Sequence, residues 1–207
     1  QYPDMFKELK ESLSFSADQP IGAMSMAQLA MDSNQLEEAE KWLKKAVLQD
    51  QTSAAGHESY AVLLSRMGKT QQALDQLEIA IKLEPDNVRF RYLIALTYAE
   101  IGDTEKTETL LRDIVKRAPG HDRAHYNLGL LLAGKEKLDE AILSIMRAEN
   151  ANPQSPDYPY ARATIHMRQG DKERAFEACR TALGAQRDYQ PALNLIRQIA
   201  QQQRRGK

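Results

Sequence analysis

Small and apolar side chains recur along most of the chain with a fixed period of 34 residues. Five consecutive segments of this length run without an insertion from residue 20 to residue 189, and they begin at Pro20, Ala54, Val88, Asp122 and Pro156. We number the positions within each segment from 1 to 34. A constant period of this kind indicates a stack of similar units, because each unit buries its apolar face against the next one.

Three positions of the segment carry small residues. Position 8 holds Ala27, Ala61, Ala95, Gly129 and Ala163. Positions 20 and 27 hold alanine in every segment except the third, which has Thr107 and Ile114. Small side chains at this spacing let two helices cross closely, so each segment is predicted to be a helix, a tight turn and a second helix. In the third segment we expect the two helices to splay slightly or to pack with a different offset.

Position 15 marks the turn between the two predicted helices. It holds glycine in three segments, and asparagine or glutamate in the others: Asn34, Gly68, Gly102, Glu136 and Gly170. Glycine favours this place because a chain that leaves a helix often adopts a left-handed conformation, which is unfavourable for a residue with a side chain. Position 32 holds Pro85, Pro119 and Pro153, and proline ends the second helix since it lacks the amide donor.

Both flanks of the repeated region are predicted to be helical. Residues 4–14 place Met5, Phe6, Leu9 and Leu13 on one stripe of an amphipathic helix. Residues 190–203 predict a closing helix whose inward side chains are Leu193, Ile196 and Ala200, followed by a frayed basic tail. The expected organisation is therefore an N-terminal helix and lead-in (1–19), five repeats (20–53, 54–87, 88–121, 122–155, 156–189), and a C-terminal capping helix with its tail (190–207).

The five segments resemble the tetratricopeptide repeat (TPR) family. The segment in which His125-Tyr126-Asn127-Leu128-Gly129 precedes Glu140-Ala141-Ile142 and Ala148 carries the resemblance best, which extends over about four fifths of the chain. It implies an all-α, right-handed α-solenoid of five helix-turn-helix repeats. It also implies a non-catalytic scaffold that binds a peptide or protein segment in a concave groove formed by the first helices.

Composition removes several other classes of function. The chain is 42% hydrophobic and 28% charged with a net charge of −1, which argues against a nucleic-acid-binding protein. No apolar run reaches the length of about 18 residues that a membrane-spanning helix needs. The single cysteine, Cys179, excludes an internal disulfide and a cysteine-rich metal site. We predict no cofactor and no metal.

Three motifs that could indicate chemistry have simpler interpretations. Gly68-Lys69-Thr70 resembles the end of a phosphate-binding loop, but Leu63 occupies the position of its required glycine. His121 and His125 have the outer spacing of a zinc-protease helix, but His121 follows Pro119 in a loop. Cys179 falls at a core position, where a thiol behaves as a small hydrophobe, and catalysis with His166 is the less favoured alternative.

The family resemblance implies that positions 2, 5, 9, 12 and 13 of each segment face the groove. The candidate groove residues are three equivalent tyrosines with neighbouring arginines and leucines: Tyr92, Tyr126, Tyr160, Arg89, Arg123, Leu96, Leu130 and Arg168. They would suit a peptide with apolar anchors and an occasional carboxylate. The tyrosines can equally be ordinary repeat residues. Arg162 and His166 replace apolar residues in the fifth segment, either as a structural adaptation or for binding.

Two alternatives to a groove-binding scaffold remain open. One is self-association through Met5 and Phe6 or through Leu193 and Ile196. The other comes from a weaker resemblance: the lead-in and the segment from Asp157 to His166 are similar to repeat modules of exported bacterial proteins, including multihaem cytochromes. This resemblance implies an adaptor for a redox partner and slightly favours a periplasmic location. The start at Gln1 indicates a processed or excised chain.

Overall fold

The computed structural model describes residues 19–205, with side chains as far as Gln202. Every regular element in this range is a helix, which confirms the all-α class. The helices are α2 (Pro20–Asp32), α3 (Leu36–Gln49), α4 (Ala54–Arg66), α5 (Thr70–Leu83), α6 (Val88–Glu100), α7 (Thr104–Arg117), α8 (Asp122–Gly134), α9 (Leu138–Ala151), α10 (Asp157–Arg168), α11 (Lys172–Ala185) and α12 (Gln190–Arg205). The helix predicted over residues 4–14 lies outside the described residues.

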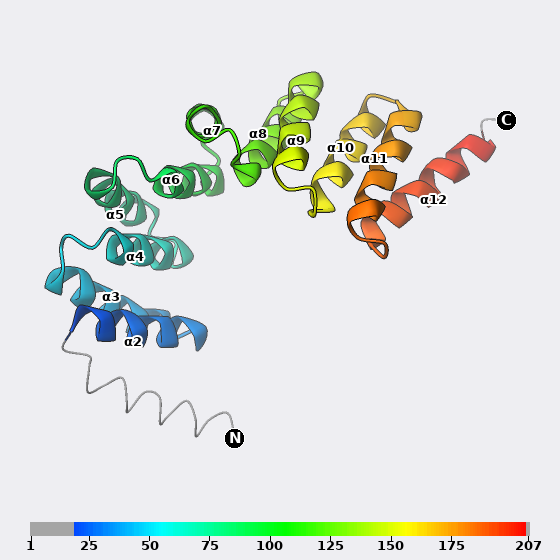
Figure 1. The fold of residues 1–207 in the computed structure, drawn as a ribbon. Coiled ribbons are helices and arrows are strands. Elements are labelled where there is room, and N and C mark those ends of the chain that lie inside the picture. The colour runs from blue at the N-terminus through cyan, green and yellow to red at the C-terminus, as the bar shows by residue number, and fades with distance from the viewer. Residues whose placement is uncertain (1–18, 206–207) are drawn as a thin grey trace, which may run out of the picture. The chain divides into compact units, whose positions relative to one another are not determined.

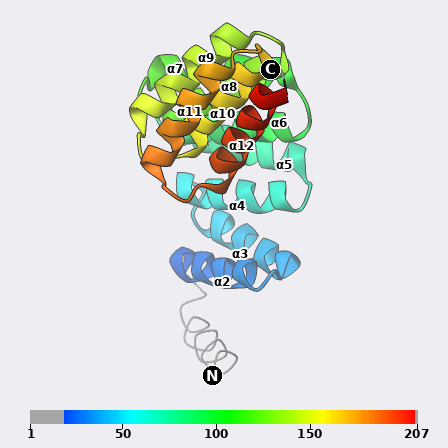
Figure 2. The same cartoon turned by 90° about the vertical axis from the view of Figure 1, so that its right-hand side faces the viewer.

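The chain divides into two compact units, residues 1–101 and 102–207. In the first unit α2 pairs with α3, and α4 pairs with α5 (Figure 1). In the second unit α8 pairs with α9 and α10 with α11, and α12 packs on α11 (Figure 2). The division falls between α6 and α7, inside the third segment, so the expected change of packing in that segment stays a prediction.

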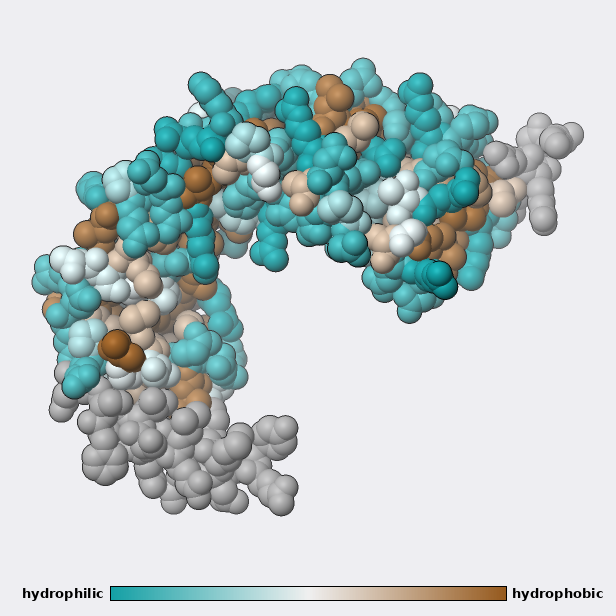
Figure 3. All heavy atoms as spheres, viewed as in Figure 1, coloured by the Kyte–Doolittle hydropathy of each residue, from teal (hydrophilic) through white to brown (hydrophobic). Residues whose placement is uncertain are grey.

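The core of each unit follows the small positions of the sequence. Ala27 and Ala61 in the first unit, and Ala163 in the second, are fully or almost fully buried where paired helices cross. Gly129 replaces alanine in α8 because space is missing there: a Cβ atom on Gly129 would lie 2.5 Å from Cγ1 of Ile145. Hydrophilic residues predominate on the face of the molecule shown in Figure 3.

The turn at position 15 is left-handed in all five segments, as the glycines predicted. The φ angle is 72° at Gly68 and 79° at Gly102 and Gly170. Asn34 and Glu136 adopt the same conformation, with φ of 56° and 59°. In four of these turns the amide after position 15 donates to a carbonyl five residues earlier, which satisfies a free acceptor at the end of the first helix: Gln35 to Ala30, Lys69 to Leu64, Lys137 to Leu132, and Asp171 to His166.

Position 4 of the segment has a role that the sequence pattern did not reveal. His57, Arg91 and His125 each contact the backbone carbonyl six residues earlier, at position 32 of the preceding segment. The three distances, to Gln51, Pro85 and Pro119, are 3.2, 3.3 and 3.0 Å. The side chain thus satisfies a carbonyl in the link between repeats. His125 is therefore a hydrogen-bonding residue as well as a packing residue.

The face through which the closing helix α12 packs matches the predicted one only in part, at Ile196. Ala192 and Ile199 are buried, Ile196 packs against the same core cluster, and Ala200 is exposed. The prediction for Ala200 was therefore wrong, because the small side chain of Ala192 makes the close approach to the core cluster that contains Ala178 and Ala182 of α11. Helix α12 also continues through Arg205, so the first residues of the predicted tail are helical.

Candidate interaction surfaces on the first helices

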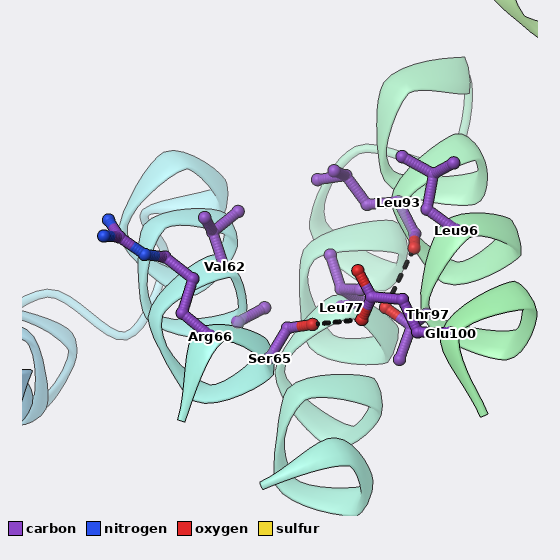
Figure 4. A pocket seen from close by; sticks show the side chains of 9 residues that line it. Val62, Ser65, Arg66, Leu77, Leu93, Leu96, Thr97 and Glu100 are labelled. Carbon is purple, nitrogen blue, oxygen red and sulfur yellow. Dashed lines mark hydrogen bonds between the residues drawn. The ribbon is translucent and has the colours of Figure 1, made fainter. Parts of the chain in front are cut away.

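A pocket of about 280 Å³ opens in the first unit between the first helices α4 and α6 (Figure 4). Its lining comes from α4, α5 and α6: Ala61, Val62, Ser65, Arg66, Leu77, Leu93, Leu96, Thr97 and Glu100. Five of these residues occupy positions 9, 12 or 13, which the family resemblance places in the groove. Of the others, Ala61 and Leu77 are at predicted packing positions, whereas Leu93 and Thr97 were not predicted, because the sequence pattern does not show where two helices diverge.

The wall of this pocket is apolar and its edge is polar. Val62 projects from α4 and is 39% exposed, and Leu93 and Leu96 line the opposite side on α6 (Figure 4). At the edge, Oγ of Ser65 donates a hydrogen bond of 2.8 Å to the Glu100 carboxylate and so joins the two helices. The Arg66 guanidinium extends from α4 away from α6 (Figure 4). The pocket can accept one large apolar side chain beside a charged edge.

The predicted groove residues of the first unit have different surroundings. Leu96 lines the pocket. Arg89 is exposed, and its Nε lies 2.5 Å from Oε1 of Glu58, which is largely buried. This ion pair engages Nε of Arg89, while the Arg89 side chain stays 72% exposed. Tyr92 is half-buried in α6.

In the second unit the predicted tyrosines pair with tyrosines that are not their equivalents. The rings of Tyr126 and Tyr158 lie 4.9 Å apart, and those of Tyr160 and Tyr189 lie 5.7 Å apart at 73°. The latter is an edge-to-face arrangement, which is favourable for aromatic rings. The partners come from outside position 5, so the sequence pattern alone did not indicate these pairs.

Aspartates at the start of the first helices hold the tyrosine hydroxyls. Tyr158 Oη donates to Asp122 over 2.7 Å, and Tyr189 Oη donates to Asp157 over 2.6 Å. Burial opposes ionisation of Asp122, but hydrogen bonds from Tyr158 and Asn152 outweigh it and lower the pKa of this carboxyl. Burial, then the hydrogen bond to Asp157, raises the pKa of Tyr189. Asp122 therefore stays ionised and Tyr189 stays protonated at neutral pH.

The other predicted groove residues of the second unit are either exposed or held by hydrogen bonds and ion pairs. Arg123 and Leu130 are exposed on α8. Arg168 at the end of α10 donates to the backbone carbonyl of Ala133 over 2.9 Å and pairs with Glu136 over 2.8 Å. Arg168 therefore covers the C-terminal end of α8, where a cation is electrostatically favourable.

The unusual fifth segment contains its own partners. Arg162 makes two hydrogen bonds to the Glu149 carboxylate, of 2.7 and 3.0 Å, in a largely buried pair. His166 is buried with Nδ1 3.3 Å from the side-chain oxygen of Gln169, and burial lowers the pKa of its imidazole. These contacts favour structural adaptation. Cys179 is fully buried, and burial raises the pKa of its thiol to about 11, so a nucleophilic thiolate does not form near neutral pH.

The described residues contain no group of three potential metal-ligating side chains. His121 instead caps α8, because its Nδ1 accepts a hydrogen bond from the amide of Ala124. Gly68 forms the turn after α4 and has no neighbouring strand within residues 19–205. No helix in the described part of the chain combines the length and apolar character that crossing a bilayer requires.

Family models described as tetratricopeptide repeats match residues 23–52, 64–128, 102–156 and 144–191. Among curated proteins, the human protein O-mannosyl-transferase TMTC1 is 26% identical over 149 residues, which are 70% of this chain. The chain spans only 17% of that protein's length.

Three solved structures have a similar fold. MamA from Desulfovibrio magneticus has a TM-score of 0.70 at 22% identity, with 84% of this chain and 98% of that chain covered. PilF from Pseudomonas aeruginosa has a TM-score of 0.73 at 18% identity, with coverage of 88% and 83%. YrrB, described as a TPR protein with an unusual peptide-binding site, has a TM-score of 0.63 at 21% identity, with coverage of 89% and 95%. Together with the matches of the family models over most of the 34-residue segments, these likenesses show that the chain belongs to the tetratricopeptide repeat family.

Proposed function

We propose that this protein is a non-catalytic interaction scaffold whose first helices bind a segment of a protein partner. The observation that carries the proposal is the pocket between α4 and α6, which combines an apolar wall with a polar edge. A partner segment would place one leucine-sized or phenylalanine-sized side chain against Val62 and Leu96. Burying such a side chain contributes roughly 1.5–3 kcal/mol, and further contacts of the segment must supply the rest of the binding free energy.

The predicted contacts of the second unit extend this proposal. Arg123 and Leu130 are exposed on one helix, seven residues apart, and therefore project from the same side of α8. An exposed leucine beside an arginine suits a partner segment that carries apolar and acidic residues. We therefore propose these two residues as additional contacts, and Leu96 as a contact within the pocket.

Selection from a random peptide display library tests the pocket even though the natural partner is unidentified. We expect the wild-type protein to enrich peptides that share one large apolar residue. The variant Val62→Asp places a charge in the apolar wall, and it should bind the selected peptides at least about tenfold more weakly. The matched control is Leu48→Asp on α3, which changes a 64% exposed leucine of the same unit outside the pocket.

Circular dichroism verifies that both variants keep their helical content, and light scattering of the same samples separates peptide binding from self-association. Equal binding of the selected peptides by Val62→Asp and Leu48→Asp would contradict the proposed pocket. Failure of the wild-type protein to enrich any shared sequence would contradict it as well.

A further inference from the structure

A second cluster of side chains with a different chemistry lies in the second unit. Tyr126 belongs to α8, Asp157 and Tyr160 belong to α10, and Tyr189 directly precedes α12. We call these four residues the tyrosine–aspartate cluster. Tyr189 Oη donates to Asp157 over 2.6 Å, and the ring of Tyr189 meets that of Tyr160 edge to face at 5.7 Å. Helix α8, which carries Tyr126, contacts α10, and burial, then the charge of Asp157, raises the pKa of Tyr126.

The Asp157 carboxylate retains capacity for a ligand. Its side chain is exposed, and among the described residues its one hydrogen bond comes from Tyr189. A carboxylate can accept about four hydrogen bonds, and no ion pair in the described part of the chain neutralises this one. Asp157 is therefore a negative charge at the surface, held in place by a tyrosine hydroxyl.

Aromatic rings lie close to Asp157. The face of a phenol ring carries the negative part of its quadrupole, and rings that meet at 73° present their faces in different directions. Tyr126, Tyr160 and Tyr189 are all half-buried. Aromatic faces beside a carboxylate are the environment that attracts an organic cation.

Two further charged residues lie at the start of α8, a helix that contacts α10. Asp122 at the start of α8 is kept ionised by hydrogen bonds from Tyr158 and Asn152. Arg123 is the neighbouring cation on α8, one turn before Tyr126. Arg123 can meet a carboxylate of the same partner.

We propose that the tyrosine–aspartate cluster binds a cationic side chain, lysine or arginine, of a protein partner. The cation would donate to Asp157 and lie against the rings of Tyr160 and Tyr126. This site lies in the other unit from the apolar pocket and has the opposite preference, so it goes beyond the proposed pocket and does not depend on it. It shares only Arg123 with the contacts that are proposed above.

Nuclear magnetic resonance of the full chain with labelled tyrosine rings tests the site directly. The probe is the capped peptide Gly-Gly-Lys-Gly-Gly, and its matched control has norleucine, which keeps the aliphatic stem without the charge, in place of lysine. We expect the lysine peptide to shift the ring signals of Tyr126, Tyr160 and Tyr189, and to bind at least about threefold more tightly than the norleucine peptide. Equal shifts with both peptides, or no shift with the lysine peptide, would overturn the proposal.

Two variants assign the effect to the cluster. Asp157→Asn keeps the shape of the side chain and should weaken lysine-peptide binding about threefold to tenfold. Asp139→Asn changes an exposed carboxylate at the start of α9 and should leave the binding unchanged. If Asp157→Asn keeps a native circular dichroism spectrum and binds as tightly as Asp139→Asn, the assignment is overturned. Because the measurement involves no residue of the α4–α6 pocket, its failure is distinguishable from failure of the proposed function.

Discussion

The crossing of α8 and α9 allows a sharp test of the packing. Position 8 is alanine in four segments but glycine at Gly129, and position 24 is leucine in the first three segments but isoleucine at Ile145. A Cβ atom on Gly129 would lie 2.5 Å from Ile145 Cγ1 and 3.1 Å from the Ala141 carbonyl oxygen. Carbon atoms pack best at about 3.5–4.0 Å, so the first contact overlaps by about 1 Å.

The substitution Gly129→Ala therefore has two opposing effects. Overpacking costs about 1–3 kcal/mol, whereas replacing glycine by alanine inside a helix contributes about 1 kcal/mol of stability. We expect a net loss of about 1 kcal/mol in the free energy of unfolding. In the Ile145→Leu background the branch at Cβ is gone and the pair matches Ala27 with Leu43, so the same substitution should stabilise by up to about 1 kcal/mol.

Urea unfolding followed by circular dichroism measures all four members of this cycle. The control is Gly134→Ala in the same helix, where a Cβ atom would meet nothing within 4 Å, and it should be neutral or stabilising. The packing argument is refuted if Gly129→Ala stabilises as much as Gly134→Ala, or if Ile145→Leu leaves the effect of Gly129→Ala unchanged.

Three further predictions concern particular residues. Burial lowers the pKa of His125 and of His166, so the second unit should be most stable above a pH of about 6.5 and should lose stability as the pH falls below that value. Equal urea midpoints at pH 7.5 and pH 5.5 would contradict this prediction. Burial raises the pKa of the Cys179 thiol from 9.0 to about 11. At pH 8 this thiol should therefore react with a disulfide reagent at least about a hundredfold more slowly in the native than in the unfolded protein. Equal reaction rates would refute the burial of Cys179. Glu136 has a φ of 59°, and its side chain is 76% exposed in the ion pair with Arg168. The substitution Glu136→Gly should therefore stabilise the protein by about 1 kcal/mol, because relief of backbone strain outweighs the loss of an exposed ion pair. A lower melting temperature of the variant would show that the ion pair contributes more than the strain costs.

The sequence alone was sufficient to predict the helices and the turns. The small residues at positions 8, 20 and 27 and the turn residues at position 15 recur at constant spacing, and each acts on its own helix pair. Local chemistry decides such features, since a left-handed turn or a close helix crossing depends on the residues at that place. This is why even Asn34 and Glu136, which lack the glycine, form the turn that their position predicts.

The candidate site depended on distances between residues that are far apart in the chain. The family resemblance placed Arg89 and Tyr160 on a groove face, but only the tertiary structure paired Arg89 with Glu58 and placed Tyr160 against Tyr189. It also decided that α4 and α6 leave a pocket, and that α12 packs through Ala192 and not Ala200. A periodic pattern predicts which side of a helix faces its neighbour. The side chains that fill the space between the two helices vary from repeat to repeat, so only the tertiary structure shows how that space is filled.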